Sequence, residues 1–201
     1  MKWIWRVDDV PGSPAHNMDT DAGLLAAMAE PGALPSVRVY TWDRAAVSFG
    51  RLQREEPVKA LYPGLPVVRR PTGGRAVLHG EDLTISVALR LDWLPEDRRS
   101  VLTSHEFVMD PIKDALISLG LTAGYGGCPL GSQKDIVDCF ALSASCDLVD
   151  SYTGKKLAGS AQRREGDALL QQVSVLGSVI SGYPRFLDYL QSAYGQTFAV
   201  I

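Results

Sequence analysis

The sequence lacks a dominant charge and a long apolar run, and each absence excludes a class of protein. The formal net charge is only −3, which gives no electrostatic case for binding nucleic acid or an anionic membrane. No stretch is long and charge-free enough to span a bilayer, and the N-terminal residues lack the apolar core of a signal peptide. We therefore expect a cytoplasmic protein that contacts neither nucleic acid nor membrane.

The sequence also has few cysteines. Cys128, Cys139 and Cys146 are an odd number in a chain without an export signal, which favours reduced thiols over disulfides. Their spacing contains no CxxC pair and no histidine lies nearby, so no metal site is expected. On local grounds each cysteine is more often a small buried hydrophobe than a nucleophile.

What the chain does have is the composition of a globular protein. Hydrophobic residues make up 46% and charged residues 21% of the sequence, which excludes disorder. The chain of 201 residues contains no internal repeat and no low-complexity linker. We predict a single domain over residues 1–201 with a sizeable core.

Hydrophobic periodicity predicts a mixture of helices and strands. Helical spacing favours helices over residues 17–30, 102–119 and 184–194, with Asp19 and Asp21 in the first turn of the first helix. Alternation and turn residues predict strands at 36–42, 45–50, 83–91, 147–150, 156–162 and 168–176, two further short strands around a glycine turn, and an irregular stretch at 122–131. This order is typical of an α+β domain.

The first candidate site is that glycine turn, RRPTGGRAVLH over residues 69–79. Gly73 and Gly74 would let the backbone adopt positive φ and approach a ligand closely. The turn is not a phosphate loop of the GxxxxGK[ST] type, because it has neither the lysine nor a following helix. On local grounds, a hairpin turn with exposed arginines is an equally good interpretation.

The second candidate site combines Cys139 with Lys156. In KKLAGSA, residues 155–161, strand alternation predicts that Lys156, Ala158 and Ser160 share one face. A lysine on a face of small residues would enter a cleft with room for a substrate. A solvated hairpin lysine is the competing interpretation, and the second lysine beside it favours that interpretation.

Five segments, in chain order, resemble the motifs of one family. They are SPAHNMDTDAGLL, VRVYTWDRAAVSFGRLQ, VVRRPTGGRAVLHGEDLTISVAL, CFALSASCDL and GKKLAGSAQRR. They are similar to the patterns PAxNMALDEALL, xRFYxWxPxTxSxGxxQ, RRxTGGRAVLHxxELTYS, CFxxxSxxEL and GRKxAGSAQ of the octanoyltransferases specific for the glycine cleavage H protein, which are relatives of the lipoate–protein and biotin–protein ligases. The matches cover nearly the whole chain.

The resemblance implies the α+β catalytic fold shared with biotin ligases and class II aminoacyl-tRNA synthetases, a mixed central sheet flanked by helices. It also implies that octanoyl passes from acyl carrier protein to Cys139 as a thioester, and then to a lysine of a lipoyl-accepting protein such as the glycine cleavage H protein. Lys156 would favour the thiolate and hydrogen-bond the acyl carbonyl. The implied substrate-binding residues are Arg70, Gly73, Gly74, Arg75, Ala76, Val77, His79, Gly159, Ser160 and Ala161.

No cofactor is implied, because exchange between two sulfurs is nearly isoenergetic and needs no ATP. The acceptor amine must lose a proton, yet no residue is marked as its general base. His79 is available, but we expect it to brace the glycine turn.

An apolar tunnel beside that turn would hold the acyl chain, with each methylene contributing ~0.8 kcal/mol of binding free energy. We expect a monomer.

The sequence departs from the family patterns at two places, and each departure leads to a further expectation. Ile85 stands where the family has tyrosine, and we expect it to reshape the acyl pocket. The chain ends at Ile201, before the further helices of typical relatives, which we expect to weaken carrier recognition.

Two other functions stay open. An ATP-dependent lipoate–protein ligase catalytic domain would use Lys156 and the glycine turn but not Cys139. Ligases usually show RRxSGGGAVxH, whereas Arg75 replaces the third glycine here, which favours the transferase. A non-catalytic acyl-carrier-binding module is the second alternative.

Overall fold

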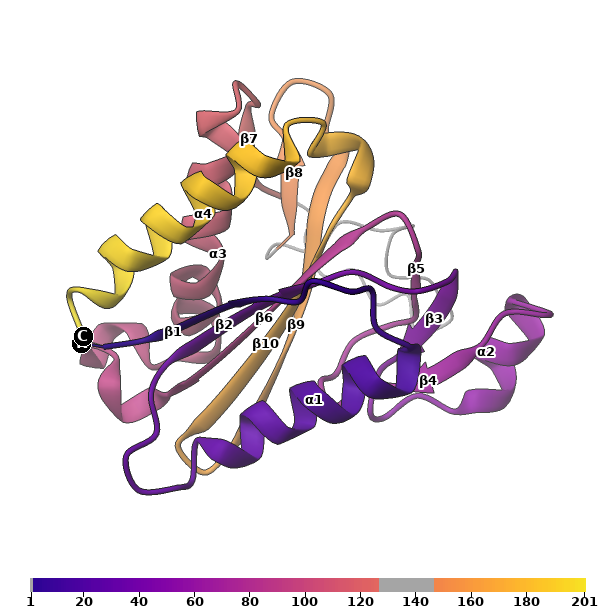
Figure 1. Cartoon of the computed structure of the whole chain (residues 1–201), viewed down its shortest axis with the longest axis horizontal. Coiled ribbons are helices and arrows are strands. Elements are labelled where there is room, and N and C mark those ends of the chain that lie inside the picture. The colour runs from indigo at the N-terminus through magenta and orange to yellow at the C-terminus, as the bar shows by residue number, and fades with distance from the viewer. Residues whose placement is uncertain (1, 127–146) are drawn as a thin grey trace.

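The computed structural model describes residues 2–126 and 147–201. Cys128, Cys139 and Cys146 lie outside the described residues, and with them lies the predicted nucleophile. Figure 1 shows the described chain as a central sheet with helices on both faces, and the two termini lie at the same side of the molecule.

Among the described residues, the central sheet has seven strands in the order β1-β2-β6-β10-β9-β8-β7. β1 runs parallel to β2, and all the other neighbours are antiparallel, so the sheet is mixed as predicted. The strands are β1 (Ile4–Val7), β2 (Ser36–Tyr40), β6 (Leu83–Arg90), β10 (Ala168–Val175), β9 (Lys156–Glu165), β8 (Leu148–Asp150) and β7 (Ala123–Tyr125).

Helices cover both faces of this sheet. α1 (Pro14–Ala27) lies on one face, and α3 (Val101–Ser118) and α4 (Tyr183–Phe198) lie on the other (Figure 1). The largest core cluster fills the space between the sheet and the α3–α4 pair, whereas smaller clusters lie under α1. Burial of apolar area on both faces is the main stabilisation of such a layered fold.

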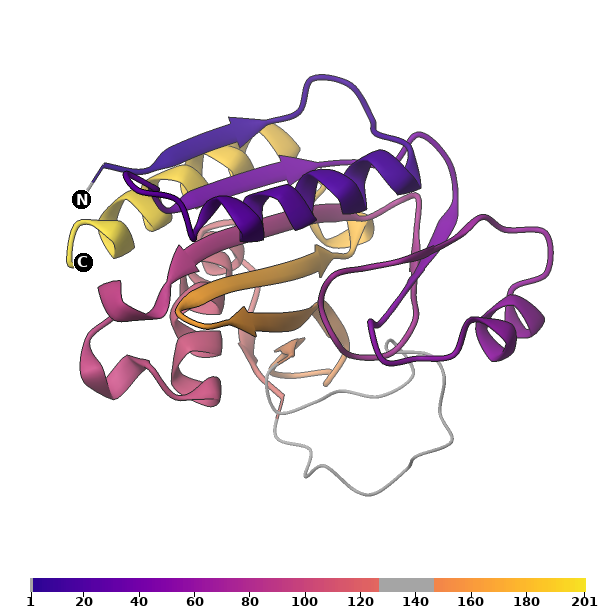
Figure 2. The ribbon, with the colours of Figure 1, turned by 90° about the horizontal axis from the view of Figure 1, so that it is seen from below.

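A second, three-stranded sheet was not predicted as a separate unit. It has the order β4-β3-β5, with β4 (Val67–Arg69), β3 (Ala46–Phe49) and β5 (Val77–His79). Together with α2 (Glu55–Leu61) it lies at one end of the central sheet, as Figure 2 shows from below. The glycine turn joins β4 to β5, so this small sheet positions it.

The first helix begins earlier than predicted. The hydroxyl of Ser13 accepts a hydrogen bond from the backbone N–H of His16, and Pro14 occupies the first turn, where its missing N–H costs nothing. Asp19 and Asp21 therefore lie beyond the first turn, and the predicted helix-dipole contact is wrong. Asp21 instead points into the protein and is fully buried.

A bulge in β9 overturns the predicted alternation around Lys156. Two adjacent residues of β8 pair with Lys156 and Ala158, so Leu157 is an extra residue in β9. Leu157 and Ala158 both pack into the large core, although strict alternation would point them to opposite faces. Lys156 is thereby turned away from the face of Ala158 and Ser160.

The sequence patterns missed β1 and α2, and β7 forms within the stretch expected to be irregular. The other predicted elements are present with boundaries shifted by a few residues. Within the described ranges, none of the helices combines the length and apolar character needed to cross a bilayer.

Candidate active site

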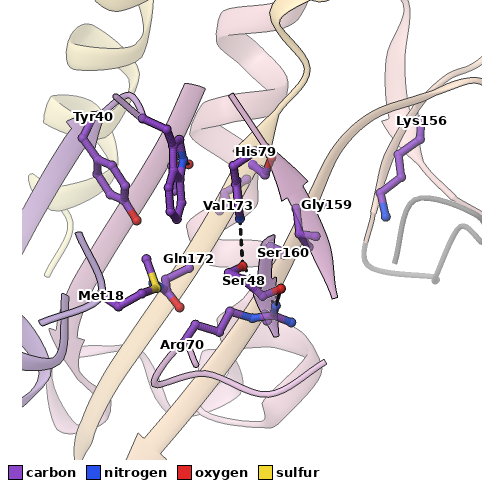
Figure 3. A pocket seen from close by; sticks show the side chains of 15 residues that line it. Met18, Tyr40, Ser48, Arg70, His79, Lys156, Gly159, Ser160, Gln172 and Val173 are labelled. Atoms are coloured by element: carbon purple, nitrogen blue, oxygen red, sulfur yellow. Dashed lines mark hydrogen bonds between the residues drawn. The ribbon is translucent and has the colours of Figure 1, made fainter. Parts of the chain in front are cut away.

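A pocket of about 430 Å³, its open mouth included, lies where the small sheet meets the α1 side of the central sheet. Its wall is mainly apolar, and Figure 3 shows most of the labelled side chains grouped together, with Lys156 at the edge of the group. The lining residues are Met18, Tyr40, Trp42, Ser48, Arg70, Val77, His79, Thr84, Lys156, Gly159, Ser160, Ala161, Gln172, Val173 and Ser174.

Arg70 holds the glycine turn from inside. Its guanidinium donates to the carbonyl oxygen of Gly73 at 2.5 and 3.0 Å and to that of Arg75 at 2.6 Å. It also donates to the carbonyl of Ser48 on β3 at 3.1 Å. Arg70 is buried, so the interpretation of an exposed hairpin arginine is wrong for this residue. Because its donors are used on the backbone, Arg70 shapes the turn.

The conformation and packing of the turn require glycine at two positions, Gly74 within the turn and Gly50 beside it. Gly74 has a φ of +84°, the left-handed region that favours glycine, whereas Gly73 does not. A Cβ on Gly50 would lie 2.0 Å from the carbonyl oxygen of Gly74, so the turn packs directly on the backbone after β3. The turn is thus rigidly seated beside the pocket.

A buried polar network anchors the same turn to the central sheet. The hydroxyl of Thr72 donates to Gln172 Oε1 at 2.6 Å, and Gln172 Nε2 donates to Asp21 at 2.6 Å. Asp21 also accepts from Arg38 and Tyr40, both at 2.7 Å. Burial and the Asp21 carboxylate hold the pKa of Tyr40 well above its ordinary value. These hydrogen bonds connect α1, the central sheet and the glycine turn to one another.

Lys156 enters the pocket from β9, as predicted, and is not a solvated hairpin lysine. Its Nζ lies 2.8 Å from Asp147 Oδ2, and the two side chains are only 7% and 4% exposed. A Cβ on Gly159 would lie 2.7 Å from this Nζ, so only glycine leaves room for the ammonium. Gly126 N donates to the carbonyl of Asp147 at 2.9 Å, which brings together the two ends of the segment that contains Cys139.

His79 has partners at both ring nitrogens. Nδ1 lies 2.8 Å from Asp82 Oδ2 and Nε2 lies 2.8 Å from Ser48 Oγ. The ring stacks on Trp42 with 3.9 Å between centroids. Burial opposes the ionisation of Asp82, but hydrogen bonds, chiefly from His79, outweigh it and hold the pKa of Asp82 below its ordinary value. This is the geometry expected of a bracing histidine.

Ser160 borders the pocket, but its hydroxyl lies on the other face of the sheet. It is 2.8 Å from Nε2 of His105 on α3. Burial lowers the pKa of His105 to about 4, opposed only in part by the nearby Asp147 carboxylate. Ile85 packs into the core on the same α3 side, so the expectation that it reshapes the pocket is wrong.

The structure brings together part of the predicted site. Arg70, Val77, His79, Lys156, Gly159, Ser160 and Ala161 border the pocket, whereas Gly73, Gly74, Arg75 and Ala76 belong to the turn beside it. Ala76 is fully buried in the core of the small sheet. The predicted role of Cys139 stays a prediction.

Several residues of the site were not predicted. Asp21 and Asp147 fall on the acidic positions of the motifs PAxNMALDEALL and CFxxxSxxEL, which is the signal that marks them. Ser48 falls on the serine of the second motif. Gln172 and His105 carry no comparable signal, because their roles depend on contacts distant in sequence.

The arrangement is suited to chemistry at a carbonyl group. A buried ammonium such as that of Lys156 can hydrogen-bond a carbonyl oxygen and stabilise negative charge as it develops. The apolar wall can hold the hydrocarbon part of such a ligand.

The sequence of this chain is similar to those of several curated proteins. The relatives include proteins named octanoyltransferase LipM from Brevibacillus brevis, with 37% identity over 183 residues, and from Bacillus subtilis, with 34% identity over 186 residues. In both cases the match covers 87% of this chain but only 66% of the relative, so the chain spans just under two thirds of their length.

Solved structures share the fold. A lipoate-protein ligase A bound with ATP superposes with a TM-score of 0.77 at 19% identity, covering 99% of this chain and 86% of that chain. A Thermoplasma acidophilum protein with bound lipoic acid gives 0.76 at 20% identity, with the same coverage. A biotin protein ligase from Leishmania major gives 0.51 at 12% identity, covering 95% and 71%.

The family model of the lipoyl protein ligase A/B catalytic domain matches residues 13–192, which include α1, the glycine turn and Lys156. The chain belongs to the lipoyl protein ligase A/B catalytic domain family.

Proposed function

We propose that this protein is a protein octanoyltransferase of lipoate biosynthesis. It takes octanoyl from acyl carrier protein onto Cys139 as a thioester and passes it to a lysine of a lipoyl-accepting protein, such as the glycine cleavage H protein. The observation that carries the proposal is the buried ammonium of Lys156 at the wall of an apolar pocket. The names of the curated relatives support the same reaction.

The pocket suits the acyl group. The aromatic and aliphatic part of its wall, including Tyr40, Trp42 and Val77, offers an apolar surface for a hydrocarbon chain. An eight-carbon chain buried there gains ~0.8 kcal/mol per methylene, which amounts to several kcal/mol of binding. The carbonyl end of the chain then faces Lys156.

Lys156 serves both half-reactions in this proposal. Its ammonium donates a hydrogen bond to the acyl oxygen when the Cys139 thiolate attacks the carrier thioester, and again when the acceptor amine attacks the Cys139 thioester. Asp147 holds the ammonium in place. No ATP is consumed, because the energy of the thioester is retained until the amide forms.

The test is incubation with octanoyl-acyl carrier protein followed by intact mass measurement. We expect an octanoyl adduct that hydroxylamine removes, and its absence from Cys139→Ala. An ATP-dependent ligase would instead attach lipoate in the presence of ATP with Cys139→Ala fully active. A carrier-binding module would bind octanoyl-acyl carrier protein without forming an adduct. Either of these results would overturn the proposal.

A further inference from the structure

The small sheet and its helix form a basic unit within an acidic chain. From β3 to β5, residues 46–79 contain six lysine and arginine residues but only two acidic ones, Glu55 and Glu56. The whole chain has the opposite sign, with a formal net charge of −3. An anionic protein should therefore be attracted to this unit and repelled by the rest of the surface.

The two acidic residues of this unit leave two of its arginines uncompensated. Glu55 Oε1 lies 2.5 Å from Lys59 Nζ, and Glu56 lies 3.8 Å from the arginine that precedes α2. Within the described part of the chain, neither Arg51 nor Arg69 forms an ion pair, and both are exposed. Their positive charges are available to a partner.

The loop after β3 holds the first of these arginines beside an exposed leucine. Gly50 N donates to Gln53 Oε1 at 3.0 Å, and Gln53 N donates to the carbonyl of Gly50 at 2.9 Å, which closes the loop into a turn. Leu52 lies within this turn and is 82% exposed, and Arg51 precedes it. The turn therefore presents an apolar side chain next to a positive charge in a fixed conformation.

Arg69 fixes this loop from the neighbouring strand β4. Its Nη1 donates to the carbonyl oxygens of Arg51 and Gln53, both at 2.9 Å. Its guanidinium carbon lies 4.4 Å from the centroid of the Phe49 ring. Because these contacts are with uncharged groups, Arg69 holds the loop and still adds its positive charge to the surface.

The same loop is bonded to the glycine turn that borders the pocket. The backbone N–H of Arg51 donates to the carbonyl of Thr72 at 2.9 Å, and that of Arg70 donates to the carbonyl of Phe49 at 2.9 Å. Both Arg70 and Ser48 line the pocket, so two chain segments lead from the pocket wall to the loop within a few residues. Figure 1 shows α2, which follows the loop, at the outer end of the molecule.

We propose that Arg51, Leu52, Arg54 and Arg69, the arginine surface, dock an acidic acyl carrier protein that delivers octanoyl to the pocket. The identity of this partner rests on the octanoyl transfer proposed above. Guanidinium groups bind carboxylate and phosphate through paired hydrogen bonds, which suits an acidic partner. An apolar side chain surrounded by charged ones is the usual anatomy of a protein–protein interface.

The donor fits this place better than the acceptor does. A carrier presents its acyl thioester at the end of a long prosthetic arm, which is joined to the protein through a phosphodiester. Its body can therefore dock on the arginine surface while the arm reaches the pocket. An acceptor lysine has a much shorter side chain, so the acceptor backbone itself must come to the mouth of the pocket. The arginine surface thus serves the loading step.

Binding of the holo-carrier, which bears the arm without an acyl group, tests this surface separately from the chemistry. Fluorescence anisotropy of labelled carrier, titrated with the full chain, should give a Kd that rises between about 50 and about 200 mM NaCl. Arg51→Glu combined with Arg54→Glu should raise the Kd about tenfold or more, because like charges then face the carrier. Leu52→Ala should raise it about threefold, because apolar contact is lost. All three side chains are exposed, so the fold should persist, which urea denaturation checks.

Arg185→Glu is the matched control, because Arg185 is an exposed arginine on α4, away from the small sheet. It should bind the carrier within about twofold of the wild-type protein. Equal weakening in this control would show that only net charge matters and would overturn the docking surface. Unchanged binding in the double variant, or no carrier binding to the wild-type protein, would overturn it too.

The same titration with the lipoyl-acceptor protein separates the two partners. We expect the double variant to bind the acceptor within about twofold of the wild-type protein. Weaker binding of the acceptor in place of the carrier, or of both equally, would overturn the assignment to the donor. A wild-type protein that binds the carrier through the arginine surface but forms no octanoyl adduct would instead overturn the octanoyl transfer and support the docking surface.

Discussion

The ammonium of Lys156 lies 2.8 Å from the carboxylate of Asp147, and neither side chain is more than 7% exposed. Paired charges in a buried site stabilise one another, whereas a single buried charge is costly. The pair also joins β9 to the residue that directly follows the Cys139 segment. The position of the ammonium therefore depends on a residue outside the lysine motif.

We expect Asp147→Asn to weaken both stability and acylation. The substitution keeps the shape of the side chain but removes its charge, so the free energy of unfolding should fall by about 1–3 kcal/mol. Formation of the octanoyl adduct should slow as well. Urea denaturation and intact mass would measure the two effects. The control is Asp167→Asn, an exposed carboxylate, which should change stability by less than about 0.5 kcal/mol. An unchanged adduct rate would contradict the role assigned to Asp147.

Gly159→Ala should impair activity far more than stability. The new methyl group would lie 2.6 Å from Cε and 2.7 Å from Nζ of Lys156, and the flexible end of the lysine can move aside. We expect a loss of stability below about 1 kcal/mol, together with a fall of about tenfold or more in the adduct rate. Gly23→Ala on α1 is the control, because nothing lies within 4 Å of its added methyl. A fully active Gly159→Ala would show that the ammonium position is not critical.

Thr72 and Gln172 should behave as a coupled pair. Thr72→Val removes the hydroxyl that donates to Gln172 at 2.6 Å, and Gln172→Leu removes both its acceptor and the donor to Asp21. A double-mutant cycle measured by urea denaturation should give a coupling energy of about 0.5–3 kcal/mol. Thr72→Val combined with Tyr152→Ala, an exposed hairpin residue, should be additive. Additivity of the first pair would mean that the network does not anchor the turn.

Because His105 is buried, we expect the free energy of unfolding to fall in mild acid. Burial lowers the pKa of His105 to about 4, whereas the unfolded chain binds this proton near the ordinary histidine value of about 6.5. The unfolded state therefore binds more protons between these values, and the free energy of unfolding falls as the pH drops from about 6.5 towards 4. Between pH 7 and pH 5 the expected loss is about 2 kcal/mol.

Urea denaturation of His105→Gln at pH 7 and pH 5 tests this linkage. The glutamine cannot titrate, so the variant should lose about 2 kcal/mol less than the wild-type protein over that interval. His16→Gln, at an exposed histidine, should show the wild-type dependence on pH. Equal losses in the wild-type protein and in His105→Gln would show that the buried imidazole does not set the acid sensitivity.

Much of the fold was predictable because periodicity reports burial. The strand over residues 83–91 and the helix over 102–119 have long apolar patterns, and both form within a residue or so of their expected limits. Short elements such as α2 and β1 have too few residues for a pattern to emerge. The separation of β3, β4 and β5 into their own sheet depends on pairing between distant segments, which local periodicity does not encode.

The candidate site was predictable where a motif marked it. Lys156, His79 and Gly159 carry motif signals and line the pocket. The pattern gave the wrong face for Lys156, because a bulge adds a residue that strict alternation cannot anticipate. Gln172 and His105 were missed for a different reason: a buried glutamine or histidine is recognised only through partners on other elements.

The bulge at Leu157 decides on which face of the sheet Lys156 lies, because successive side chains of a strand point to opposite faces and one extra residue reverses the face of those before it. β9 pairs with β10 in unbroken register from Ala158 to Glu165, so the residues after the bulge are held independently of it. Deleting Leu157 would shift only what precedes it, and Lys156 would exchange the pocket for the apolar layer beneath α3 and α4. One residue of chain length, with no change in any charged group, thus separates a lysine in the pocket wall from one that would disrupt the core.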